Sequence, residues 1–197
     1  TRFEIALQPG EFWHDTSITF DGESTAGVRS YELASRGMVR TFQLTKVLAK
    51  MPVIDNMMLA AQEQSGESMW KALLNGWRPQ ERSVEERALK ILDEFNMTHM
   101  KDEFAGALSG GQRKLLEMAR AMMAEPRLIM LDEPMAGVNP ALTQSLLGHV
   151  KRLRSEGISV MFVEHDMDVV QDISDWVIVM AEGQVIAEGP PRSIGEN

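Results

Sequence analysis

The second half of the chain alternates helical and extended patterns, and this alternation constrains the fold more than any other feature. After Leu108, apolar residues at helical spacing alternate with short, wholly apolar runs. The predicted helices cover 110–124, 140–155 and 167–173, and the predicted strands cover 128–131, 159–163 and 176–180. Short apolar strands joined by amphipathic helices are typical of a mostly parallel sheet covered by helices. The expected fold class is therefore α/β.

Antiparallel strands are expected at both ends of the chain. Apolar and polar residues alternate over 3–7 and 18–20, Pro9-Gly10 begins a turn into a second strand, and Asp21-Gly22 is typical of a hairpin. Near the C-terminus, Glu182-Gly183 is expected to close a second hairpin.

The middle of the chain predicts a helical lobe. From about Ser30 to Leu108 the apolar residues follow the helical period, interrupted near Gly66, Gly76 and Pro79. We therefore expect three parts. These are an N-terminal β part over 1–42, a helical lobe over 43–107 and the rest of the core over 108–197.

Composition excludes several classes of function. A net charge of −9 and a pI near 5.0 argue against a protein that binds nucleic-acid backbones, so no nucleic-acid partner is expected. The absence of cysteine excludes disulfide scaffolds and thiolate metal sites. No apolar run approaches the roughly 20 residues that cross a membrane, and no secretion signal is recognisable. Any role at a membrane then requires a partner protein.

Two acids follow the predicted strand 128–131. A strand buried in a parallel sheet presents carboxylates at its C-terminal edge, where ligands bind in open α/β sheets. There Asp132 is suited to hold Mg²⁺, and Glu133 to orient or deprotonate an attacking water. The alternative is chance, because many α/β proteins place acids after an apolar strand.

A glycine-rich turn begins the predicted helix at 110. The turn consists of Leu108, Ser109, Gly110, Gly111 and Gln112. Serine is a good N-cap, and the glycines let backbone N–H groups approach an anion where the helix dipole favours negative charge. The alternative is a glycine-rich helix start without a ligand. The glycine-rich turn, the helix and the acid-terminated strand follow one another in a fixed order. This combination indicates a phosphate-binding site more specifically than any one of the three features does alone.

The ordered motifs resemble those of the ATP-binding cassette (ABC) ATPases, whose signature is LSGGQ and whose Walker B strand ends in Asp-Glu. The resemblance implies a P-loop NTPase-like sheet with an N-terminal antiparallel part and an inserted helical lobe. It implies ATP and Mg²⁺ as cofactors, with Asp132 and the Q-loop glutamine Gln43 at the metal. Glu133 is then the catalytic base, and His165 matches the switch histidine that contacts the γ-phosphate.

The resemblance also assigns a D-loop, which passes signals between subunits. It consists of Ala136, Gly137, Val138, Asn139 and Pro140. Many members of the resembling family carry Asp at the place of Asn139.

Longer stretches resemble the ATPase subunits of branched-chain amino acid importers. They are "RTFQLTKVLAKMPVIDNMMLAAQ", "LDEPMAGVNP" and "EGQVIAEGPP", and the match covers most of 17–192. The resemblance implies a head-to-tail homo- or heterodimer in which the LSGGQ turn closes on ATP held by a second cassette. It further implies permease subunits, an indirect link to a solute-binding protein, and a peripheral location at the cytoplasmic face of the cell membrane.

One expected part of the site is missing from the sequence. The P-loop, Gly-x-x-x-x-Gly-Lys-Ser/Thr, wraps the phosphates with backbone N–H groups, yet the chain contains no Gly-Lys dipeptide. The resemblance places this loop near 13–15. Either the 197 residues are a discontinuous part of a longer protein that has the loop, or the protein itself lacks it. We favour the first, because deletion would expose apolar faces of neighbouring elements.

Two other functions compete with an ATP-hydrolysing importer subunit. A cassette without a P-loop would not hydrolyse ATP and would donate its LSGGQ turn to an active partner. DNA-repair and chromosome-organising ATPases share the motifs but insert long coiled coils. Residues 44–107 have no sustained heptad and contain Pro52 and Pro79, which disfavours that class.

Overall fold

The computed structural model describes residues 3–6, 17–41, 47–61 and 78–194 of the chain. The strands are β1 (Phe3–Ala6), β2 (Ser17–Phe20), β3 (Glu23–Ser24), β4 (Met38–Arg40), β5 (Leu128–Asp132), β6 (Ser159–Val163), β7 (Val177–Ala181) and β8 (Gln184–Gly189). The helices are α1 (Ser30–Ser35), α2 (Val53–Met58), α4 (Arg78–Glu94), α5 (Gly110–Met122), α6 (Pro140–Ser155), α7 (Met167–Ile173), α8 (Pro191–Ile194) and the 3₁₀ turns η3 (Thr98–Met100) and η4 (Ala105–Ala107). In these ranges no helix is both long and apolar enough to cross a bilayer.

The centre of the fold is a parallel sheet in the order β4-β5-β6. Strand β5 lies in the middle. Its Leu128 pairs with Met38 of β4 on one side and with Ser159 of β6 on the other. The expected strands at 128–131 and 159–163 are confirmed, and β5 extends one residue further, to Asp132. Strand β4 could not be expected from the sequence, because three residues are too few to show a period and its partner strand lies about 90 positions away.

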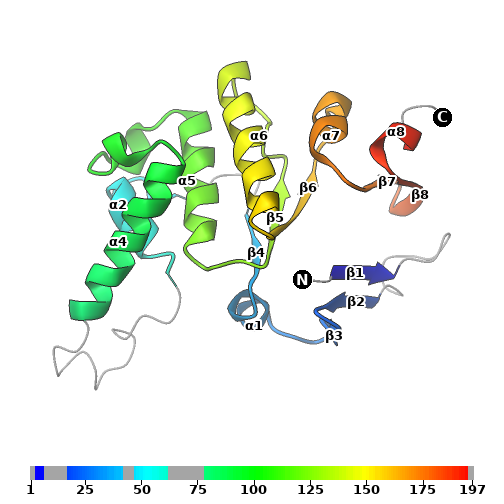
Figure 1. Cartoon of the computed structure of the whole chain (residues 1–197), viewed down its shortest axis with the longest axis horizontal. Coiled ribbons are helices and arrows are strands. Elements are labelled where there is room, and N and C mark those ends of the chain that lie inside the picture. Colours follow the sequence, from blue (N-terminus) through cyan, green and yellow to red (C-terminus); the bar gives the residue numbers. More distant parts are fainter. Residues whose placement is uncertain (1–2, 7–16, 42–46, 62–77, 195–197) are drawn as a thin grey trace.

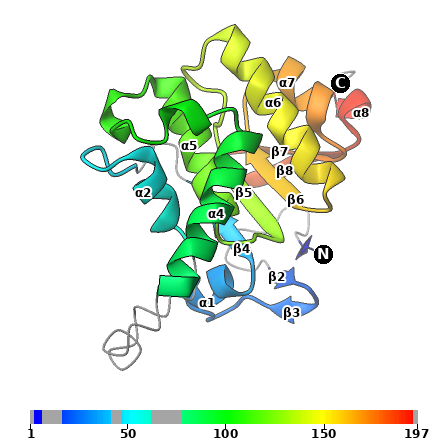
Figure 2. The ribbon, with the colours of Figure 1, turned by 60° about the vertical axis from the view of Figure 1, so that its left-hand side comes forward.

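The two faces of β5 pack against different layers. Ile129 and Leu131 belong to the main core, which they share with buried residues of α4, α5 and α6. Leu128 lies in a second, smaller core with Phe20 and Met38. Figures 1 and 2 show the main layer of helices beside the parallel strands and the β1–β3 sheet beyond α1. The result is the helix-covered α/β architecture that the alternating pattern predicts.

Both expected hairpins are present. Strands β2 and β3 turn at Asp21-Gly22, with φ of 53° and 81°, and β7 and β8 turn at Glu182-Gly183, with φ of 50° and 79°. Left-handed φ at both central residues is the requirement of a type I′ hairpin turn. The second strand expected after Pro9-Gly10 lies outside the described residues.

Strand β6 has an open edge in the described part of the chain. It pairs there with β5, whereas β7 pairs with β8 and does not extend the parallel sheet. Met161 and Val163 on β6 are exposed, Val163 by 58%. Val160 and Phe162 pack against the main core, so the exposed Met161 and Val163 lie on the opposite face of this edge strand.

A buried asparagine organises the start of the helical lobe. The Asn56 side chain is fully buried in α2; its Oδ1 accepts the Leu48 N–H at 2.8 Å. Its Nδ2 donates to the carbonyls of Leu48, Met51 and Pro52 at 3.0–3.2 Å. Arg120 of α5 donates in turn to the Asn56 carbonyl at 3.1 Å. The Asn56 side chain therefore holds the loop before α2 by its backbone. Helix α5 in turn holds the backbone of α2 through Arg120.

A buried histidine joins α6 to α4. The ring of His149 stacks on Phe95 with centroids 4.2 Å apart, and it is almost wholly buried. Burial, together with the nearby charge of Arg152, lowers the pKa of His149 below its ordinary value of 6.5. The folded protein therefore favours the neutral ring.

We expect the stability to fall in mild acid because of His149. A group with a lowered pKa in the folded state stabilises fully above its unfolded pKa, and this contribution is lost as the pH falls below about 6.5. His149→Phe keeps an aromatic ring against Phe95 and removes the titration. Urea denaturation at pH 7.5, 6.5 and 5.5 should show a smaller loss in the variant than in the wild type; equal losses would contradict the assignment.

Candidate functional site

The C-terminal ends of β5 and β6 bring two predicted catalytic residues together. Asp132 pairs with Val163 in the sheet, so the residues that follow the two strands emerge at one edge. The Glu133 Oε1 atom lies 3.9 Å from His165 Nδ1, with the histidine side chain 76% exposed and the glutamate 30%. A carboxylate and an imidazole at this distance are both accessible to a ligand at the strand ends.

The backbone of Glu133 is unusual. Its φ is +44°, in the left-handed region that glutamate rarely adopts, and its N–H donates to the Val163 carbonyl at 3.0 Å. Such a conformation persists only where surrounding contacts hold it, and it is concentrated at functional sites. The turn directs Glu133 to the neighbouring strand's end rather than along β5.

Asp132 lies beside a cation that the sequence analysis missed. Arg40, at the end of β4, places its Nη2 atom 3.5 Å from Asp132 Oδ2. The adjacent Thr41 N–H donates to the Met130 carbonyl at 2.9 Å, which continues the pairing of β4 with β5. This contact could be expected only if the pairing of β4 with β5 was known, because no local pattern in the sequence links positions 40 and 132.

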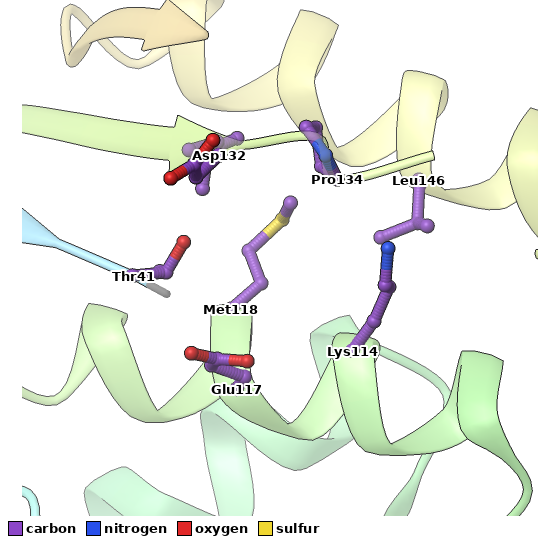
Figure 3. Close-up of a pocket in the computed structure, with 8 residues that line it drawn as sticks. Thr41, Lys114, Glu117, Met118, Asp132, Pro134 and Leu146 are labelled. Carbon is purple, nitrogen blue, oxygen red and sulfur yellow. The ribbon is translucent and has the colours of Figure 1, made fainter. Parts of the chain in front are cut away.

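A small pocket lies between α5 and the end of β5. It is lined by Thr41, Lys114, Glu117, Met118, Leu131, Asp132, Pro134 and Leu146. Figure 3 shows Lys114 and Met118 pointing from α5 toward the segment that carries Asp132 and Pro134. The signature helix is thus in direct contact with the acid-terminated strand.

The residues at this edge fit a magnesium ion held jointly with phosphates. Asp132 supplies one partly exposed carboxylate, and Mg²⁺ is usually bound by one or two carboxylates together with substrate phosphates and water. The described residues contain no cluster of three or more His, Cys, Asp or Glu side chains that would form an all-protein cage. The second expected ligand, Gln43, lies outside the described residues.

The signature turn is a capping box at the start of α5. The Gln112 N–H donates to Ser109 Oγ at 3.3 Å, and the Ser109 N–H donates to Gln112 Oε1 at 2.8 Å. Leu108 is buried, whereas Ser109 and Gly110 are exposed, and the space beside the Gly110 Cα is open. The exposed helix start leaves room for an anion to approach the backbone.

We expect Ser109→Ala to lower the free energy of unfolding by about 1 kcal/mol, because the helix loses its N-cap acceptor. Urea denaturation measures the change. Ser155→Ala is the control, since the exposed Ser155 hydroxyl only donates to Arg152 within the last turn of α6. The control should change stability by less than about 0.5 kcal/mol, and equal losses would argue against the cap.

The predicted D-loop residues form the turn between β5 and α6. The Ala136 N–H donates to the Glu133 carbonyl and the Val138 N–H to the Met135 carbonyl, each at 3.2 Å, while Gly137 adopts a φ of +69°. Asn139 ends the turn as the N-cap of α6, with its Oδ1 accepting the Leu142 N–H at 2.9 Å. An amide oxygen at Asn139 therefore serves the cap that aspartate would serve.

The sequence matches the family model described as ABC transporter over residues 8–136. A probable branched-chain amino acid transport ATP-binding protein, LivG, of Archaeoglobus fulgidus is 41% identical over 180 residues, which cover 91% of this chain and 70% of that protein. The high-affinity branched-chain amino acid transport ATP-binding protein BraF of Pseudomonas aeruginosa is 38% identical over 183 residues, with 91% and 72% covered.

Solved structures agree with the sequence matches. A nucleotide-free ATP-binding cassette from an ABC transporter superposes with a TM-score of 0.75 and 38% identity, covering 89% of this chain and 70% of that one. A cassette in its ADP conformation superposes with a TM-score of 0.74, also at 38% identity, covering 89% and 69%. The matched family model, the level of identity and the shared fold together show that this chain belongs to the ABC transporter ATPase family.

Proposed function

We propose that this chain is the ATP-hydrolysing subunit of an importer for branched-chain amino acids or related solutes, bound peripherally at the cytoplasmic face of the membrane. The observation that carries the proposal is the pairing of Glu133 with His165 beside Asp132 at one edge of the parallel sheet. The names of the relatives supply the solute class.

The roles follow from the chemistry of each group. Glu133 accepts a proton from the water that attacks the γ-phosphate, and His165 donates a hydrogen bond to that phosphate. Asp132, together with Gln43, would hold Mg²⁺, which would supply positive charge beside the transferring phosphate. The Ser109 turn of a second cassette closes on the same nucleotide with its backbone N–H groups. ATP thus lies between two chains, and permease subunits contact the helical lobe.

Transport-coupled hydrolysis tests this proposal. The full-length protein is assembled with its permease in lipid vesicles, and ATP hydrolysis is measured with and without a solute-binding protein loaded with leucine, isoleucine or valine. Loaded binding protein should raise the rate. A complete complex that hydrolyses no ATP under any of these conditions would overturn the proposal.

A second candidate is a cassette that only donates its signature turn. It is favoured by the absence of a Gly-Lys dipeptide, which leaves the sequence without the P-loop lysine. Intact-mass measurement of the protein purified from its source separates the two. A mass of 22.1 kDa supports the donor, and a mass several kDa larger supports the hydrolase.

A further inference from the structure

The ammonium group of Lys114 bridges two points on the loop that follows β5. It donates to the carbonyl of Glu133 at 2.8 Å and to the carbonyl of Ala136 at 2.6 Å. A lysine ammonium has three N–H donors, so most of its capacity is committed to this loop. The loop, residues 133–139, contains the proposed catalytic glutamate and the predicted D-loop except Pro140, which begins α6; we call it the 133–139 loop.

Strand β6 holds the other side of the same loop. The Glu133 N–H donates to the Val163 carbonyl at 3.0 Å, and the Met135 N–H donates to Glu164 Oε1 at 2.8 Å. Glu133 itself has a left-handed φ, which needs such support. Lys114 is the support that comes from α5, and it acts at the carbonyl of the strained residue.

The start of α5 also touches the far end of the loop. A Cβ atom at Gly111 would lie 2.7 Å from Leu142 Cδ1 and 3.4 Å from Val138 Cγ1, so the helix backbone approaches this end closely. Gly111 and Lys114 are three positions apart and therefore lie on the same face of the helix. One short stretch of α5 contacts the loop at both ends.

The ammonium of Lys114 lies among carboxylates but is partly withdrawn from water. Burial lowers the pKa of Lys114, and the carboxylates of Glu164, Glu117 and Glu133 act in the opposite direction. The side chain is only partly buried, and its stem lines the pocket between α5 and β5 (Figure 3). The ammonium group is therefore near the carboxylates of Glu117 on α5, Glu133 on the loop and Glu164 after β6.

We propose that Lys114 is a positioning residue that makes the start of α5 and the 133–139 loop move as one body. When the Ser109 turn closes on the partner cassette's nucleotide, α5 moves the Glu133 carbonyl with it through Lys114. This movement fixes the position of the Glu133 carboxylate in this chain's own nucleotide site. This inference rests on the proposed function, since it assumes that Glu133 is the catalytic base. It adds a route by which one nucleotide site acts on the other.

Kinetics of the assembled transporter test the proposal. Lys114→Met removes the ammonium and keeps the stem, Lys114→Arg restores two or more donors, and Lys151→Met is the matched control because Lys151 only bridges to Asp172 on the surface. We expect Lys114→Met to lower kcat about tenfold or more with KM for ATP within about twofold. Lys114→Arg should recover most of kcat, and Lys151→Met should match the wild type.

Hydrogen exchange gives a readout without turnover. The amides of Ala136 and Val138 should exchange faster in Lys114→Met than in Lys151→Met. An unchanged kcat, unchanged exchange, or a rise in KM with a lower Tm and no rescue by arginine would overturn the positioning role. If the wild-type complex hydrolyses no ATP, the proposed function fails, and the exchange comparison still decides whether Lys114 holds the loop.

Discussion

Glu133→Gln in the assembled transporter is expected to reduce ATP hydrolysis by a factor on the order of 10² or more while nucleotide binding is retained. Glutamine fills the same volume but accepts no proton from water, and general-base catalysis contributes roughly 10²–10⁴-fold. Because the nucleotide stays intact, two cassettes should remain closed around it. Phosphate release from the transporter measures the rate, and size-exclusion chromatography of the full-length cassette without its permease, run with ATP, measures the closed dimer.

The control for this experiment is Glu164→Gln, which changes the next acid along the sheet edge. Glu164 accepts a hydrogen bond from the Met135 N–H, and a glutamine oxygen accepts the same bond, so hydrolysis should fall far less. Unchanged turnover in Glu133→Gln would remove Glu133 from its catalytic role, as would an equal loss in both variants.

Asn56→Leu is expected to have the largest effect on stability, lowering the free energy of unfolding by about 3–5 kcal/mol. The substitution keeps the approximate volume but leaves the Leu48 N–H unpaired. The carbonyls of Leu48, Met51 and Pro52 lose the amide donor but keep one backbone N–H each. The unpaired N–H costs about 1–3 kcal/mol, and the loss of the two amide N–H donors costs about 0.5–1.5 kcal/mol each. Urea denaturation followed by circular dichroism measures the loss.

Asn139→Ala is the matched comparison, because it also removes an asparagine amide that binds backbone. Asn139 accepts one hydrogen bond at an exposed helix start, so its loss should cost about 1 kcal/mol. Similar losses in the two variants would show that burial and the number of partners at Asn56 do not decide its contribution.

The elements that could be predicted from sequence are those with a local signal where they begin. The expected bounds of α6 and α7 are confirmed because a side chain caps each helix, Asn139 in one and Asp166 in the other. Strand β4 carries no such signal. Its three residues form a strand only because they pair with β5. Pairing between residues about 90 positions apart produces no pattern in the short stretches of sequence from which a strand is predicted.

The candidate site divides in the same way. The motifs point to Glu133 and His165 separately, and the adjacency of β5 and β6 explains why the structure brings them together. Arg40 and Lys114 could not be predicted, since one depends on β4 and the other binds backbone carbonyls that every residue possesses. The roles of Gln43 and the boundaries of the helical lobe stay predictions.

The open edge of β6 has a practical consequence for handling the protein. Unpaired strand edges with apolar side chains template pairing with other chains, and natural proteins cover or charge them to stay soluble. In the described part of the chain β6 pairs with β5 alone, and Met161 and Val163 are exposed on one of its faces. Concentrated solutions of these 197 residues alone should therefore aggregate, and a lysine at position 161 should delay the onset of light scattering.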